Sequence, residues 1–226
     1  MRNYLRTVIT VVWKDIVAEA RNKEILTSML VFSLLVILIF NFALDLDVQA
    51  QESVTAGVLW VTFTFAGTLG VNRSMASERE GGCLDGLLLV PVDRSALYVG
   101  KALGNLIFLL VVEVIVLPIY SVLFNVNLLV PGFLLVVLLG SMGYIAVGTL
   151  LAAMSVQVRT RDILLPILLF PLTIPILIPA VKASIGYLEG YPGSWIMTWL
   201  NIIIVYDLIF TAIAVMLFEY VVEEWS

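Results

Sequence analysis

Few residues in this chain could do chemistry. The sequence has no histidine and one cysteine, Cys83, so it lacks the side chains for histidine metal or haem ligation, for Ser-His or Cys-His catalysis and for an internal disulfide. Gly81 and Gly86 have the spacing of a phosphate-binding loop, but Leu87 and Leu88 follow where Lys and Ser or Thr are needed. We therefore expect no catalytic residue, no metal site and no ATPase motif in this chain.

Two acids, Glu113 and Asp207, lie near the middle of long apolar runs. A charged carboxylate at mid-membrane costs roughly 2.5 to 3.5 kcal/mol, and no Lys or Arg lies inside these runs to pair with it. One hypothesis is that each is a neutral acid bonded to a neighbouring helix. The other is that both line a translocation path or a subunit seam. An aspartyl protease is disfavoured because neither acid lies in a Gly-flanked Asp motif.

The composition indicates the elements that must position these acids. The chain has 226 residues, of which 62% are hydrophobic and 13% are charged, and its mean hydropathy is +1.09. These values are typical of an all-α membrane protein with several spans. A bilayer-crossing helix needs roughly 20 apolar residues. Six runs meet this requirement, and the predicted spans are 25–44, 53–72, 102–124, 133–156, 163–181 and 196–218.

The basic residues predict the orientation of these spans. With six spans both termini lie on one side, and that side collects every Lys and Arg except Lys182. Because basic loops stay in the cytoplasm, both termini and the stretch 77–101 are predicted to be cytoplasmic, in a multi-pass protein of the cytoplasmic (inner) membrane. Nothing in the sequence indicates nucleic-acid binding.

Residues 1–24 are predicted to form an interfacial amphipathic helix, followed by a transmembrane domain over 25–226. The apolar residues recur at intervals of three and four: Leu5, Val8, Ile9, Val12, Trp13, Ile16 and Val17. The charged residues that we expect to face headgroups and water are Arg6, Lys14, Glu19 and Arg21. The helix is either a membrane-surface anchor or an elbow that also touches a cytoplasmic subunit, because both need the same pattern.

The segment 77–95 is predicted to be a cytoplasmic docking element. Ser77 and Glu80 fit a capping box, so a short helix is expected to begin at Ser77 and to end at Pro91. Asp93 is expected to cap the next helix. The expected apolar face is formed by Cys83, Leu84, Leu87 and Leu88, and the polar face by Glu78, Arg79 and Asp85.

Two further features concern the helices themselves. The fifth run contains four prolines, each of which removes a backbone hydrogen bond, so a straight rod is not expected; the span is either statically kinked or reshaped during a cycle. The candidate kink residues are Pro166, Pro171, Pro175 and Pro179. Small residues four apart, Ala66 with Gly70 and Gly100 with Gly104, indicate close helix packing first and a dimer interface second.

These residues also carry a family resemblance. The stretch EREGGCLD over 78–85, followed by Leu87-Leu88, Val90-Pro91 and Gly100-Lys101, resembles the cytoplasmic loop of ABC-2-type export permeases. The run LFPLTIPIL over 169–177 and the N-terminal Lys14-Asp15 with Glu19, Arg21, Lys23 and Glu24 are similar to the haem exporter protein B (CcmB) family, the permease subunit of the cytochrome c maturation system. Where that family usually has Ser or Thr, Leu and Glu, this chain has Cys83, Leu84 and Asp85.

The resemblance implies a type V half-transporter that forms a homodimer and pairs with two copies of an ATP-binding subunit. It also implies a haem-handling membrane subunit, a small accessory membrane protein and a periplasmic haem chaperone, with ATP and haem bound by partners rather than by this chain. ATP hydrolysis would drive either haem export or release of the haem-loaded chaperone. The ATPase-docking residues would be Glu78, Arg79, Glu80, Gly82, Leu84, Asp85, Leu87 and Leu88.

Two other classes of function remain open. An ABC-2 permease for a drug, lipid or polysaccharide would share the cytoplasmic loop but would not need a span with four prolines. A membrane scaffold without an energy source would not need an acidic, glycine-containing helix that faces the cytoplasm.

Overall fold

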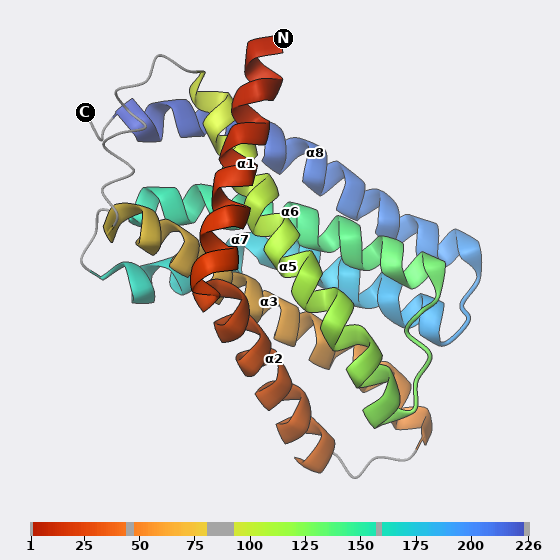
Figure 1. Ribbon diagram of the computed structural model, residues 1–226. Helices are drawn as coiled ribbons and strands as arrows, with labels where there is room; N and C mark the ends of the chain where they lie inside the picture. The colour runs from red at the N-terminus through yellow and green to blue at the C-terminus, as the bar shows by residue number, and fades with distance from the viewer. Residues whose placement is uncertain (1, 44–47, 81–92, 157–159, 224–226) are drawn as a thin grey trace.

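The computed structural model describes residues 2–43, 48–80, 93–156 and 160–223, and the regular secondary structure within these residues is entirely helical. The helices are α1 (Arg2–Asn22), α2 (Glu24–Ala43), α3 (Val48–Glu80), α5 (Arg94–Phe124), α6 (Pro131–Ser155), α7 (Arg161–Leu188) and α8 (Gly193–Glu223). Figure 1 shows how they assemble into one bundle, with α1 on its surface.

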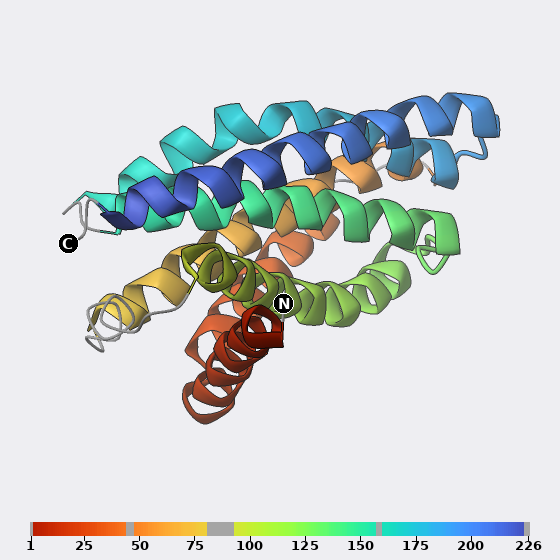
Figure 2. The same ribbon diagram turned by 90° about the horizontal axis from the view of Figure 1, so that it is seen from above.

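Six of these helices are long and apolar enough to cross a membrane, which confirms the predicted number of spans. Two of them, α3 and α6, bury 72% of their apolar window inside the protein, whereas the other four bury 22% to 39%. The helix α6 packs against α3, α5, α7 and α8 and lies between the other layers in Figure 2. The bundle is therefore built around α6, and the other spans present most of their surface outward.

Glycines on α6 make this central position possible. A Cβ atom at Gly140 would lie 2.1 Å from the Cη2 atom of Trp60, and the indole Nε1 of Trp60 donates a hydrogen bond to Ser184 Oγ on α7 (3.0 Å). Tyr144 donates from its hydroxyl to the Thr64 carbonyl (2.7 Å) on α3. The Trp60 ring of α3 thus fits into the space at Gly140, and the Tyr144 ring of α6 fits into the space at Gly67 of α3. The polar atom of each ring is satisfied across a helix interface.

The capping-box prediction at Ser77 is wrong, because α3 continues as a helix through Ser77 to Glu80. The Ser77 hydroxyl donates to the Ser74 carbonyl (3.0 Å) instead of capping a new helix. No helix-breaking residue separates Val71 from Glu80, so the polar stretch extends the span until Gly81. By contrast, the prediction at Asp93 is confirmed, since its carboxylate accepts from the backbone N–H of Ser95 (3.0 Å) at the start of α5.

The four prolines do not break α7, which is one continuous helix with Pro166, Pro171, Pro175 and Pro179 inside it. Each proline removes one N–H donor, but the remaining bonds of the helix are sufficient to keep it intact. Pro171 and Pro175 are exposed on the outer surface, whereas Pro179 is buried. A static kink in α7 and a change in its shape during a cycle both stay predictions.

The helix α1 lies on the bundle against α5 (Figures 1 and 2). Its residues Leu5, Ile9 and Trp13 are 57% to 67% exposed on one face, while Val8 and Val11 are buried on the opposite face. An outward apolar stripe is what an interfacial helix requires, and the interfacial position of α1 stays a prediction. The helix also has a second apolar face, which packs on the protein.

The packing of α6 can be tested by adding a methyl group. We expect Gly140→Ala to destabilise the chain by about 1–3 kcal/mol, because the new Cβ overlaps the Trp60 ring, which the Ser184 hydrogen bond holds in place. Gly148→Ala is the matched control, since the nearest atom to its Cβ would lie at an ordinary 3.7 Å. Thermal unfolding in detergent measures both, and equal stability of the two variants would contradict this account.

Candidate functional site

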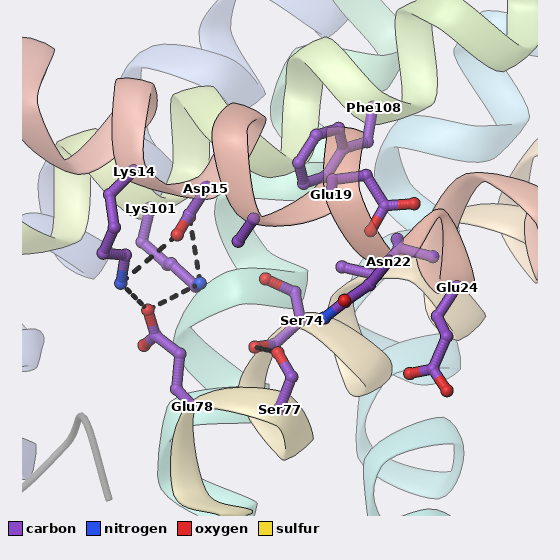
Figure 3. Close-up of a pocket in the computed structure, with 12 residues that line it drawn as sticks. Lys14, Asp15, Glu19, Asn22, Glu24, Ser74, Ser77, Glu78, Lys101 and Phe108 are labelled. Atoms are coloured by element: carbon purple, nitrogen blue, oxygen red, sulfur yellow. Dashed lines mark hydrogen bonds and ion pairs between the residues drawn. The ribbon is translucent and has the colours of Figure 1, made fainter. Parts of the chain in front are cut away.

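Four charged side chains from α1, α3 and α5 meet at one end of the bundle (Figure 3). Lys101 Nζ lies 3.0 Å from Asp15 Oδ2 and 3.0 Å from Glu78 Oε1. Lys14 Nζ lies 3.3 Å from Asp15 Oδ1 and also contacts Glu78 Oε1. We call these four residues the ion cluster; its two ammonium groups and two carboxylates alternate, so its formal charge is zero.

The ion cluster is mostly shielded from solvent. The side chains of Asp15, Glu78 and Lys101 are 6% to 9% exposed, whereas that of Lys14 is 41% exposed. Burial of a charge costs several kcal/mol unless a partner of opposite charge compensates it. Each buried member here depends on the others, so the cluster fixes the relative positions of three helices.

Lys14 forms the open edge of the ion cluster. Partial burial by itself would lower the pKa of Lys14, but the carboxylates of Glu78 and then Asp15 outweigh this effect, and the pKa of Lys14 is raised above 10.5. A raised pKa means that protonated Lys14 stabilises the folded state. This contribution is complete below the ordinary lysine value and is lost as the pH rises through the raised pKa.

Two glycines on α5 allow α1 to approach the ion cluster. A Cβ atom at Gly100 would lie 2.8 Å from the Cβ of Val11, and one at Gly104 would lie 3.1 Å from Asp15 Oδ2. Larger residues would push α1 outward and pull Asp15 away from Lys101. The prediction that this pair serves close helix packing is confirmed, and the partner helix is α1 of the same chain.

The turn between α1 and α2 depends on Glu19, which we predicted to face headgroups and water. That prediction is wrong, because Glu19 is only 5% exposed and its Oε1 accepts from the backbone N–H of Leu26 (2.8 Å). The first N–H groups of α2 need such an acceptor. Lys23 makes the turn itself with a φ of 55°, and its N–H donates to the Glu19 carbonyl (2.7 Å).

A cavity of about 220 Å³ lies beside the ion cluster between α1, α2, α3 and α5. Figure 3 shows the side chains that line it, including Glu19, Asn22, Ser74 and Ser77 together with the cluster residues. Its walls combine carboxylates, amide and hydroxyl groups, so it is suited to water or another small polar group.

The predicted docking residues that the structure describes differ in their exposure and contacts. Glu78 is not on an outer polar face but is buried in the ion cluster. Arg79 is exposed and donates to the Val156 carbonyl at the end of α6, and Glu80 is the last residue of α3. The other predicted docking residues lie outside the described residues: Gly82, Leu84, Asp85, Leu87 and Leu88. Docking through this segment therefore stays a prediction.

The two intramembrane acids lie on different sides of α6. Glu113 is 1% exposed and accepts from the Ser141 hydroxyl. Asp207 packs against Gly143, where a Cβ atom would lie 2.0 Å from Asp207 Oδ1. Because residues two apart on a helix point in nearly opposite directions, the acids contact opposite faces of α6. Glu113 has the geometry of an acid hydrogen-bonded to a neighbouring helix, and the path or seam hypothesis stays untested for both.

The amino-acid sequence matches one protein family over most of its length. Residues 6–222 match the family model described as CcmB protein. The chain belongs to the CcmB family. Three relatives, each named "Heme exporter protein B", share this membership: that of Pseudomonas aeruginosa is 28% identical over 80% of this chain and 81% of its own length. The relative from Rhodobacter capsulatus is 31% identical over 64% of this chain and 67% of its own length. The relative from Haemophilus influenzae is 27% identical over 70% of this chain and 72% of its own length.

In this CcmB-family chain, sequence reasoning missed that Lys14, Asp15 and Lys101 act together. A signal was present, because Lys14-Asp15 and Gly100-Lys101 are both part of the pattern that resembles the family. Asp15 also interrupts the apolar positions of the first helix, and Lys101 directly precedes an apolar run. The sequence could not reveal that two residues 86 positions apart pair with each other.

Removal of one cation should disrupt the ion cluster. We expect Lys101→Met to destabilise the protein by about 3–5 kcal/mol, because Asp15 and Glu78 are then left buried with only the half-exposed Lys14. Arg73→Met is the control, since it breaks the exposed Arg73–Glu24 pair (3.1 Å), worth less than about 1 kcal/mol. Detergent unfolding that gives the two variants equal losses would disprove the role of the cluster.

The raised pKa of Lys14 predicts a pH signature. The difference in unfolding temperature between the parent chain and Lys14→Met should be constant below pH 10.5 and should shrink above it. The control is Lys182→Met, which removes an exposed lysine near the end of α7 and reports the general effect of alkaline pH on the unfolding temperature. A difference that grows with pH above 10.5 would have the wrong sign.

Proposed function

We propose that this chain is the permease subunit of an ABC-type exporter in the cytochrome c maturation system, and that a separate subunit hydrolyses ATP. The observation that carries the proposal is the CcmB match over residues 6–222, together with relatives named for haem export. The six candidate spans support a permease role.

In this proposal the end of the bundle with the ion cluster faces the cytoplasm of the inner membrane, and both termini lie on that side. The basic residues of α1 and of the α3 and α5 ends support this orientation. Two copies of the chain pair with two ATP-binding subunits. A haem-handling membrane subunit, a small accessory protein and a periplasmic haem chaperone complete the assembly.

The ATPase subunit would dock on the segment that joins α3 to α5. The end of α3 and the start of α5 carry Glu78 and Lys101, which form the same ion cluster. A displacement of the segment therefore acts on two helices that are ionically coupled to each other. Through Asp15 and Lys14 it also acts on α1. The ion cluster in this way would transmit motion from the ATPase to three helices.

The amino-acid composition bears on which subunit of the complex would bind haem. The chain has no histidine, so partner subunits would supply histidine ligands to the haem iron, and this chain would supply the conformational change. That change would drive either passage of haem or release of the haem-loaded chaperone.

A deletion strain complemented with variants tests this function. Deletion should abolish c-type cytochromes, detected by haem stain, and should leave b-type spectra intact. The double variant Glu80→Lys/Asp85→Lys should fail to restore them and should no longer retain the ATPase subunit on purification, because two docking charges are reversed. Glu189→Lys, on the opposite end of the bundle, should restore both.

Two results would contradict the proposal. Normal c-type cytochromes in the deletion strain would favour an exporter of another substrate, or a scaffold if no ATPase co-purifies with the chain. Full activity and ATPase retention in the Glu80→Lys/Asp85→Lys variant would remove the docking assignment alone.

A further inference from the structure

The contact between α5 and α6 contains a line of polar side chains that begins at the ion cluster. One turn after Lys101, Asn105 Nδ2 donates to Thr149 Oγ1 of α6 (3.1 Å). Two turns further, Ser141 of α6 donates to Glu113 Oε1. The four side chains of these two contacts belong to residues that are at most 2% exposed. We call the contact between these two helices the α5–α6 seam.

The α5–α6 seam has a regular register. Asn105 and Glu113 are eight residues apart on α5, and Thr149 and Ser141 are eight apart on the antiparallel α6, about 12 Å in each case. Leu109 and Ile145 lie midway on their helices, and both are buried in the hydrophobic core. An apolar layer therefore separates the Asn105–Thr149 contact from Glu113.

Two buried oxygen atoms along the seam have no protein partner among the described residues. They are Asn105 Oδ1 and Glu113 Oε2. An unsatisfied buried acceptor costs about 1–3 kcal/mol, and a carboxylate costs more. Both atoms need a donor. Water suits the amide oxygen, and a proton suits the carboxylate because it removes the charge together with the missing hydrogen bond.

Among the residues that the structure describes, no lysine or arginine forms an ion pair with Glu113. The nearest lysine on its own helix is Lys101, twelve residues or about 18 Å away. Apart from the ion cluster and the charged residues near the helix ends, the other titratable groups among the described residues of α5 and of the elements packed against it are six tyrosines and one acid: Tyr4, Tyr98, Tyr120, Tyr144, Tyr206, Tyr220 and Asp207. The charged groups at the mouth of the seam are Lys14, Asp15, Glu78 and Lys101.

We propose that Glu113 is a proton-binding site that exchanges its proton with water at the ion cluster along the α5–α6 seam. A proton delivered as hydronium from the aqueous phase binds to Oε2 and leaves a neutral water molecule, while the Ser141 hydroxyl continues to donate to Oε1. Asn105 and Thr149 hold water in the part of the α5–α6 seam that lies between the ion cluster and the Leu109–Ile145 layer. This apolar layer is the barrier that opens for proton exchange. The site depends on the fold alone and is independent of the cargo.

Asp207 provides an internal comparison within the same chain. It is also a buried acid, but it packs on the other face of α6 against Gly143 and Ile176. Changes in the α5–α6 seam should therefore affect Glu113 and leave Asp207 unchanged.

Proton binding can be measured with dicyclohexylcarbodiimide, which reacts with protonated carboxyl groups in apolar surroundings. The full chain in lipid nanodiscs should acquire an adduct on Glu113, located by peptide mass spectrometry. The adduct yield should fall several-fold as the pH is raised, because the carboxyl loses its proton. Glu113→Gln should give no adduct at this position. An absent adduct, or one whose yield does not change with pH, would overturn the site.

The path can be measured by thiol access in a Cys83→Ser background. Glu113→Cys should react with a water-soluble thiosulfonate several-fold faster when Leu109→Ala or Ile145→Ala opens the barrier, and several-fold more slowly with Asn105→Leu. The matched control is Leu103→Ala, which trims the outer face of α5 and should leave the rate unchanged. Asp207→Cys should not respond to Leu109→Ala or Ile145→Ala.

Gel filtration first establishes which variants are folded, and either Leu109→Ala or Ile145→Ala suffices for the comparison. If Leu103→Ala accelerates the reaction as much as these variants, or if Asp207→Cys responds equally, the α5–α6 seam is not the path. The level of c-type cytochromes in these strains tests the proposed function only. It does not change the interpretation of the adduct measurement or of the thiol reaction rates.

Discussion

The salt bridges of Lys101 to Asp15 and Glu78 are the interaction on which the rest of the structure depends. They hold the surface helix α1, the end of α3 and the start of α5 together at a point where three charges are buried. Such a contact is stable only when all members are present, because a single unpaired charge at this depth is expensive. Gly100 and Gly104 provide the space that brings Asp15 within reach.

The same constraint explains the interior of the bundle. Polar groups within the spans cannot rely on lipid, so they are satisfied by neighbouring helices. Trp60 donates to Ser184, Tyr144 donates to the Thr64 carbonyl, and Asn105 donates to Thr149. The last two of these contacts converge on α6, whose glycines admit bulky neighbours. The exceptions include Asn105 Oδ1, Glu113 Oε2 and both carboxylate oxygens of Asp207, which have no hydrogen-bond partner among the described residues.

The position of the ion cluster connects the fold to the proposed function. The segment between α3 and α5 is where an ATPase subunit would act, and both flanking helices contribute a residue to the ion cluster within about two turns of that segment. A displacement of one of these helices would act on the other, because Glu78 and Lys101 contact each other directly. The α5–α6 seam begins at the same place, so the proposed motion and the proposed proton exchange would share one element, α5.

The sequence by itself determined the class of protein, the number of spans, the amphipathic first helix and the cap at Asp93, because apolar runs, periodicity and local capping are encoded by neighbouring residues. It could not determine where α3 ends, since the Ser77–Glu80 pattern fits both a helix start and a helix interior. Only the tertiary structure decided that Glu19 and Glu78 point inward, that Lys101 pairs with Asp15, and that Glu113 and Asp207 lie on opposite faces of α6. These are contacts between residues distant in sequence, and their free energy depends on burial, which no local pattern specifies.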